Sequence, residues 1–279
     1  HCMMLENCCY DFFEMATLNM AQQGLFGDVM HAEGAYIHDL RSYNYDTTAT
    51  GYKNMWRLKA QKEEAGNPYP THGLGPVAQI LNIHRGDRMA TLVSMSNAQK
   101  GMHLYAAEHD IAGEDTARID MGDMNTTLIR TAKGKTIMIQ HDVTSPRPYN
   151  RIHMVSGTKG FAQKYPLTGI ALEPNAHEFV SQQTLDSLLK VYEHPFCKEI
   201  GEKARKVGGH GGMDFIMDYR LIHCLKNGLP LDMDVYDAAE WSCLVELTDY
   251  SVRNGSVPVQ IPDFTRGEWD KLQGLTFAE

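Results

Sequence analysis

The pattern of apolar and polar positions divides the chain into helical and extended segments. Apolar side chains recur at helical spacing, which predicts helices, in 11–23, 74–84, 184–193, 213–227 and 233–254. Extended patterns, which predict strands, occupy 2–7, 27–36, 89–96, 123–131, 136–143 and 152–156. The turn signal at 132–135 joins two of these strands and predicts a hairpin. Strands come first and most helices follow, an order that indicates an α+β domain.

Residues 38–70 are mostly polar and predict a long irregular loop with one short element at 56–59. A loop of that length inside a compact domain is usually functional. The strands around it predict an open, mostly antiparallel β-sheet with helices on one face. The other face is then available to a partner, and we expect a second copy of the chain there, giving a homodimer.

Composition narrows the class of protein. With 43% hydrophobic and 22% charged residues, the 279-residue chain is an ordinary globular protein of one large or two small domains. A net charge of −9 argues against a nucleic-acid partner. No apolar run approaches the roughly 18 to 20 residues that span a bilayer. The six cysteines form no C-x-x-C pair, and the sequence contains no H-E-x-x-H or other cluster of histidines and carboxylates. We therefore expect no metal site.

Residues 1–7 read as a buried strand already under way, and the first residue is His1 rather than an initiator methionine. We therefore expect an amino-truncated chain whose leader would lie upstream. The compartment stays open on this evidence, and an exported or periplasmic protein is compatible with it.

The segment 67–77 places a tyrosine, a threonine and a histidine in four residues, Tyr69-Pro70-Thr71-His72. Prolines on both sides of Tyr69 fix φ and push the preceding residue toward an extended conformation. The apolar pattern of 74–84 follows directly. We expect a rigid loop that presents His72 at a helix N-terminus, as an active site requires. The alternative is a proline-stiffened turn with a surface histidine.

Several segments, in order, resemble glycoside hydrolase family 109, the NAD-dependent α-N-acetylgalactosaminidases of the Gfo/Idh/MocA oxidoreductase superfamily. The segments are Met3-Met-Leu-Glu-Asn-Cys-Cys-Tyr10, Gly34-Ala-Tyr-Ile-His38, Tyr52-Lys-Asn-Met-Trp-Arg57, Tyr69-Pro-Thr-His-Gly-Leu-Gly75, Gly122-Asp-Met-Asn125, Thr144-Ser-Pro-Arg-Pro-Tyr149 and Gly208-Gly-His-Gly-Gly-Met-Asp214. The resemblance is to the C-terminal portion of the family. It implies that 1–26 is a remnant of a Rossmann domain and that 27–279 is a substrate-binding domain.

The resemblance also implies site residues, each with a plainer structural alternative such as a packing tyrosine or a solvated strand. It assigns sugar contacts to Tyr36, Tyr69, Pro70, Thr71, His72 and Tyr149, and by extension to Arg57. It assigns NAD contacts to Asn7, Tyr52, Lys53, Asn54, Met55, Trp56 and Tyr69. The loop Gly208–Gly212 with His210 is one of the resembled segments, and its plainer reading is a flexible loop and helix N-cap.

The resembled family hydrolyses a terminal α-N-acetylgalactosamine through oxidation at C3, elimination, water addition and reduction, with NAD not consumed. We expect His72 to act in proton transfer, since its ordinary pKa suits that task, and Tyr69 to bridge cofactor and sugar. Sugar dehydrogenases of the superfamily commonly carry an aspartate where this chain has Pro68, which favours the glycosidase. The alternatives are an NAD(P)-dependent sugar dehydrogenase and a non-catalytic sugar-binding or dimerisation module.

Overall fold

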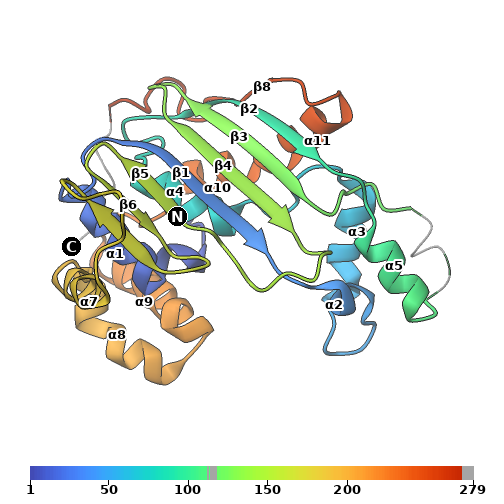
Figure 1. The fold of residues 1–279 in the computed structure, drawn as a ribbon, viewed down its shortest axis with the longest axis horizontal. Helices are drawn as coiled ribbons and strands as arrows, with labels where there is room; N and C mark the ends of the chain where they lie inside the picture. Colours follow the sequence, from blue (N-terminus) through green and yellow to red (C-terminus); the bar gives the residue numbers. More distant parts are fainter. Residues whose placement is uncertain (112, 114–117, 272–279) are drawn as a thin grey trace.

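The structure, a computed structural model, describes residues 1–111, 113 and 118–271, so 272–279 of the expected substrate domain lie outside it. One eight-stranded sheet runs through the molecule (Figure 1) in the order β7-β6-β5-β1-β4-β3-β2-β8. The strands are β1 (Val29–Ile37), β2 (Met89–Ser96), β3 (Asn125–Thr131), β4 (Thr136–Asp142), β5 (Met154–Gly157), β6 (Gly160–Gln163), β7 (Gly169–Leu172) and β8 (Val259–Gln260). Among the described strands, only β1 and β4 pair in parallel, so the predicted open, mostly antiparallel sheet is confirmed.

Helices account for a large part of the remaining described chain. They are α1 (Phe12–Gln22), α2 (Arg41–Tyr45), α3 (Trp56–Glu63), α4 (Thr71–Ile80), α5 (Gly101–Glu108), α7 (Gln182–Val191), α8 (Pro195–Val207), α9 (Met213–Asn227), α10 (Val235–Ser242) and α11 (Leu244–Arg253). Short 3-10 helices occupy Asn7–Tyr10 (η1), Lys53–Met55 (η2) and His210–Gly212 (η3). Among the described helices, none combines the length and apolar character needed to cross a bilayer.

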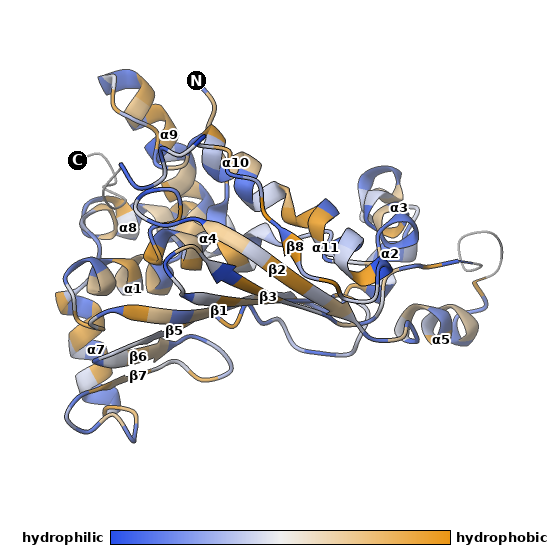
Figure 2. Cartoon of the chain, turned by 90° about the horizontal axis from the view of Figure 1, so that it is seen from above, coloured by the Kyte–Doolittle hydropathy of each residue, from blue (hydrophilic) through white to orange (hydrophobic). Residues whose placement is uncertain are grey.

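The sheet has one covered and one open face (Figure 2). Helices α4, α10 and α11 lie on the same side of it, and the main core forms between them and the strands, around large buried side chains such as Leu74 and Trp241. On the opposite face, Leu128 of β3 is 55% exposed and Met95 of β2 is 63% exposed. Alternation along each strand produces this division, because successive side chains point to opposite faces.

Two glycines bring α4 close to β1. A Cβ at Gly34 would lie 2.0 Å from the carbonyl oxygen of Gly73, and a Cβ at Gly73 would lie 2.4 Å from the amide nitrogen of Ala35. No side chain fits in that space, so both positions need glycine. The first turn of α4, which carries His72, therefore packs directly on the strand that carries Tyr36.

Three sequence predictions are corrected by the structure. The strand expected at 2–7 is wrong: in the described chain, residues 1–6 join no sheet, and the Glu6 carboxylate accepts the Cys8 N–H and begins η1. The loop expected over 38–70 contains α2, η2 and α3. The single helix expected at 233–254 is two helices that meet at Cys243.

The other predicted elements are confirmed within a few residues, including the β3–β4 hairpin. In the main core, helix α1 packs with α4, and α9 packs with η1. The division of the chain at residue 26 into a Rossmann remnant and a substrate-binding domain stays a prediction.

Candidate active site

The side chains assigned to the sugar converge on Tyr36, near the end of β1. The Tyr36 ring centroid lies 4.8 Å from that of Tyr69, 5.3 Å from His72 and 6.4 Å from Tyr149. These residues come from β1, the loop before α4, α4 itself and the segment after β4. Segments far apart in the sequence thus build one aromatic cluster, which we define as Tyr36, Tyr52, Trp56, Tyr69 and Tyr149.

Arg57 lies buried within the aromatic cluster. Its guanidinium carbon is 4.6 Å from the ring centroid of Trp56, 4.8 Å from Tyr52, 5.0 Å from Tyr69 and 5.4 Å from Tyr36. Among the described residues, no carboxylate lies within ion-pair distance of it, and its Nε and Nη1 atoms have no hydrogen-bond partner. Buried donors without partners are uncommon in native proteins. These two N–H groups are therefore oriented for a ligand or ordered water.

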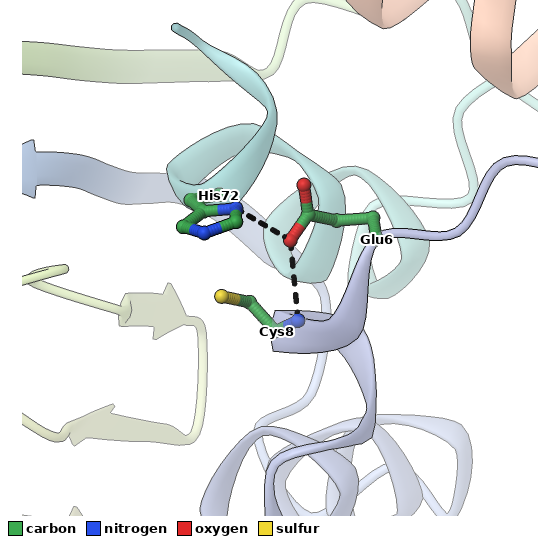
Figure 3. A group of neighbouring side chains, drawn as sticks. All are labelled: Glu6, Cys8 and His72. Carbon is green, nitrogen blue, oxygen red and sulfur yellow. Dashed lines mark hydrogen bonds and ion pairs between the residues drawn. The ribbon is translucent and has the colours of Figure 1, made fainter. Parts of the chain in front are cut away.

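His72 forms a pair with Glu6 (Figure 3). Its Nδ1 lies 2.8 Å from Glu6 Oε1, and the same oxygen accepts the backbone N–H of Cys8 at 3.1 Å. Glu6 is buried, whereas the His72 side chain is 18% exposed. The ion pair places Nδ1 against the carboxylate, and the other ring nitrogen, Nε2, is the atom available for proton transfer.

Burial and neighbouring charges shift the pKa values of the Glu6 carboxyl and of the tyrosines at the site. Burial raises the pKa of the Glu6 carboxyl, but hydrogen bonds from His72, Thr71 and the Cys8 backbone outweigh it, so the pKa lies below its ordinary value. Burial, followed by the negative charge of Glu6, raises the pKa of Tyr69 to about 12. Burial likewise raises the pKa of Tyr36 and of Tyr149. At neutral pH these phenols are protonated and act as hydrogen-bond donors.

The residues assigned to NAD lie on two sides of the Glu6–His72 pair. Asn7 follows Glu6 directly and donates to Asp214 at 2.6 Å. On the other side, His72 is 4.9 Å from Tyr69, Tyr69 is 6.3 Å from Trp56, and Trp56 is 5.6 Å from Tyr52. Between these rings, Lys53 and Asn54 are exposed and Met55 is half-buried. Asn54 and Met55 have left-handed backbone, which turns the strip into α3.

Pro70 and Thr71 have local roles in the structure. Pro70 is the N-cap residue of α4 and is buried, while Thr71 begins the helix and helps to lower the pKa of the Glu6 carboxyl. Together they fix the direction in which His72 leaves the loop.

Sequence reasoning missed two side chains at the site. Glu6 was assigned to a strand, so its pairing with His72 was not foreseen. His141 of β4 lies opposite Tyr36 in the sheet register, 6.2 Å away and stacked, and both of its ring nitrogens are buried without partners. Burial, and then the charge of Arg57, lowers the pKa of His141 to about 3, so the ring is neutral. Its sequence signal is its place in the alternation of β4, where the preceding buried positions are the apolar Ile137 and Ile139.

Glu6, Cys8 and His72 present possible metal-ligand atoms within 4.8 Å of one another. Burial, followed by the charge of Glu6, raises the pKa of the Cys8 thiol, whereas a metal binds the deprotonated sulfur. A second group, His84 with Asp234 and Asp237, is already occupied by Arg85, which donates to Asp237 at 2.9 Å and 3.0 Å. The donor sets favour hydrogen-bonded pairs over ion binding.

Two dehydrogenases are among the solved structures that share this architecture. A levoglucosan dehydrogenase in complex with NADH and levoglucosan matches with a TM-score of 0.62 at 15% identity, covering 93% of this chain and 65% of that chain. An inositol dehydrogenase homolog from Azotobacter vinelandii, complexed with NADH and myo-inositol, matches with a TM-score of 0.53 at 13% identity, covering 91% and 63%. At these identities the likeness shows that the chain shares the fold of these two proteins over most of its length.

Sequence comparison shows to which family the chain belongs. The glycosyl hydrolase 109 C-terminal domain matches residues 10–271, and the chain belongs to this family. It is 60% identical over 274 residues to an alpha-N-acetylgalactosaminidase of Bacteroides fragilis, covering 97% of this chain and 64% of that protein. It is 53% identical over 292 residues to a glycosyl hydrolase family 109 protein of Porphyromonas gingivalis, covering 100% and 61%. The chain thus spans less than two thirds of the length of these relatives.

Proposed function

We propose that the complete protein hydrolyses glycosides of terminal α-linked N-acetylgalactosamine and uses NAD as a cofactor that is not consumed. The observation that carries the proposal is the convergence of Tyr69, His72 and Tyr149 on Tyr36, with Arg57 buried among the rings. Aromatic faces with a few directed polar groups suit a sugar, which is apolar on its C–H faces and polar at its hydroxyls. Membership of the family and the name of the Bacteroides fragilis relative support the choice of sugar.

The residues that would hold the nicotinamide part of NAD are Asn7, Tyr52–Trp56 and Tyr69. They fit the group because the strip offers aromatic faces beside His72, and because Arg57 holds two buried N–H donors without partners at the same place. When bound, NAD supplies a hydride acceptor for a ring carbon of the sugar and returns the hydride later. No carboxylate pair of the kind that ordinary glycosidases use is needed in this chemistry.

The protein's own residues would bind the sugar and move its protons. His72 Nε2 accepts the proton of a ring hydroxyl, and the negative charge of Glu6 stabilises the resulting imidazolium. Tyr69, protonated because of its raised pKa, donates a hydrogen bond to the same part of the ring. Tyr36 and Tyr149 position the ring by contact and hydrogen bonding. Sugar dehydrogenases of the superfamily commonly carry an aspartate at the position of Pro68. In this chain Glu6, from a distant segment, would supply the carboxylate beside His72.

The test is hydrolysis of 4-nitrophenyl α-N-acetylgalactosaminide by the complete protein, before and after removal of NAD. We expect release of 4-nitrophenol that depends on NAD, with no net NADH absorbance and no loss on chelation of divalent metals. NADH formed in proportion to sugar would instead identify a dehydrogenase. Absence of turnover with retained sugar binding would identify a non-catalytic module.

A further inference from the structure

A row of rings continues from the aromatic cluster toward the surface. The Tyr149 side chain is 38% exposed, and its ring centroid lies 5.1 Å from that of His38 and 6.2 Å from that of Tyr165. His38 and Tyr165 are half-buried. We define His38, Tyr149 and Tyr165 as the outer row. It shares Tyr149 with the aromatic cluster, where the Tyr36 ring centroid is 6.4 Å from that of Tyr149.

The outer row and the aromatic residues assigned to NAD reach the cluster through different rings. The Trp56 ring centroid lies 6.3 Å from that of Tyr69, whereas the Tyr165 ring centroid lies 6.2 Å from that of Tyr149. Tyr36 contacts both Tyr69 and Tyr149 and so lies between the two groups. A sugar held at Tyr36 therefore has the NAD strip beyond Tyr69 and the outer row beyond Tyr149.

A buried network of charges holds the Tyr149 hydroxyl. This hydroxyl accepts a hydrogen bond of 3.2 Å from Nη1 of Arg151, which is a buried residue. Nη2 of Arg151 donates to Asp11 at 2.8 Å and also to Glu14. The Lys164 ammonium lies 2.7 Å from Asp11 and 2.8 Å from Glu14, so two cations face two carboxylates. Because the Tyr149 hydroxyl accepts from Arg151, its own proton is left for another acceptor.

The same network fixes the position of Tyr165. Lys164 precedes it in the chain, and the Lys164 Nζ atom lies 5.5 Å from the Tyr165 ring centroid. The backbone N–H of Tyr165 donates to the carbonyl oxygen of Ile152 at 3.2 Å, next to Arg151 in the chain. Burial raises the pKa of Tyr165 and lowers the pKa of His38. Both side chains are therefore uncharged at neutral pH and can exchange hydrogen bonds with hydroxyl groups.

We propose that the outer row is a second carbohydrate subsite, which binds the sugar to which the terminal N-acetylgalactosamine is attached. The inference rests on the proposed function. A pyranose is apolar on its C–H faces and polar at its hydroxyls, so uncharged rings with fixed polar ends suit it. The charge network and the Tyr165 backbone bond hold these rings before a ligand arrives, which lowers the cost of binding. An aglycone without a ring, such as serine, has no face to stack there.

The experiment compares two substrates in the complete protein with NAD. One is methyl α-N-acetylgalactosaminide, and the other is a disaccharide in which N-acetylgalactosamine is α-linked to a second hexose. Both release an aliphatic alcohol, but only the disaccharide has a ring in its aglycone. For Tyr165→Ala we expect kcat/KM on the disaccharide to fall by about tenfold, the scale of one lost ring contact. On the methyl glycoside it should change by less than about threefold, which also shows that the variant is folded.

Two controls accompany this variant. Tyr165→Phe keeps the ring and should keep kcat/KM within about threefold of wild type on both substrates. Tyr250→Ala removes a tyrosine of α11 that is 57% exposed and should change neither value.

A loss of the same size on both substrates would overturn the assignment, because Tyr165 would then only support Tyr149 in the first sugar site. No loss on either substrate, or a loss for Tyr165→Phe as large as that for Tyr165→Ala, would exclude ring stacking. A matching loss on serine-linked N-acetylgalactosamine would assign the surface to a peptide instead of a sugar. Wild-type protein that hydrolyses none of these substrates would refute the proposed function itself, so the two failures are distinguishable.

Discussion

Replacing Arg57 by methionine should change the free energy of unfolding little and lower the activity strongly. The guanidinium contacts four aromatic rings, which together stabilise it by about 2–8 kcal/mol at ~0.5–2 kcal/mol for each ring. Its two buried N–H groups without partners cost about 2–6 kcal/mol at ~1–3 kcal/mol for each donor. These terms nearly cancel, and methionine keeps the length of the side chain. We expect the free energy of unfolding of Arg57→Met to stay within about 2 kcal/mol of wild type.

Activity should respond very differently. If the free donors bind the ligand, each charged hydrogen bond contributes about 1.5–3 kcal/mol, so kcat/KM should fall by roughly 10²–10⁴-fold. Urea unfolding gives the first quantity and release of 4-nitrophenol gives the second.

Arg220→Met is the matched control for stability. Arg220 is equally buried but donates two bonds of 2.8 Å to Asp232, so its loss should cost about 3–5 kcal/mol of unfolding free energy. A large stability loss for Arg57→Met with near-normal kcat/KM would refute the reasoning, since Arg57 would then be a structural residue.

Three further predictions follow from named contacts. His72→Ala should lower kcat by about 10²-fold or more with little change in NAD affinity; near-normal turnover would make His72 a structural loop residue. For His84, burial lowers the pKa, but Asp234, Glu240 and Asp237 outweigh it and raise it to about 9, so its stabilisation is complete below the ordinary pKa of 6.5 and disappears as pH rises through about 9. His84→Gln should therefore lower the unfolding free energy by about 3 kcal/mol at pH 6 and by little at pH 10; equal losses at both pH values would contradict the linkage. We also propose that the open sheet face joins two copies, so Leu128→Glu should convert a dimer to a monomer in sedimentation, whereas an unchanged mass would exclude that face.

Local patterns predicted β1 to β5, α1, α4, α7 and α9 because strands and amphipathic helices leave periodic signals, but they predicted none of α5, α8, β6, β7 and β8. Two further differences have physical reasons. Helix α3 (Trp56–Glu63) carries charges over most of its surface and follows two left-handed residues, Asn54 and Met55, so no apolar period announces it. The apolar residues Met3 and Met4 suggested a strand, yet they pack against the core without joining the sheet.

The candidate site was predictable where a motif is contiguous, and Tyr69 and His72 are the clearest case. It was not predictable where partners are distant in sequence. Nothing local indicates that Glu6 binds His72, or that Asp214 links His210 to Asn7, because those pairings depend on how η1, α4 and α9 pack. His141 is hidden for the same reason, since only the β1–β4 register places it beside Tyr36.

The central claim is most directly tested by following the C2 hydrogen of the sugar. The complete protein with NAD is incubated in D₂O with 4-nitrophenyl α-N-acetylgalactosaminide, and the released sugar is analysed by NMR and mass spectrometry. Our account predicts one deuterium at C2, aglycone released in equal amount, and no accumulation of NADH. Sugar that keeps its C2 hydrogen, or NADH that accumulates without release of 4-nitrophenol, would contradict it.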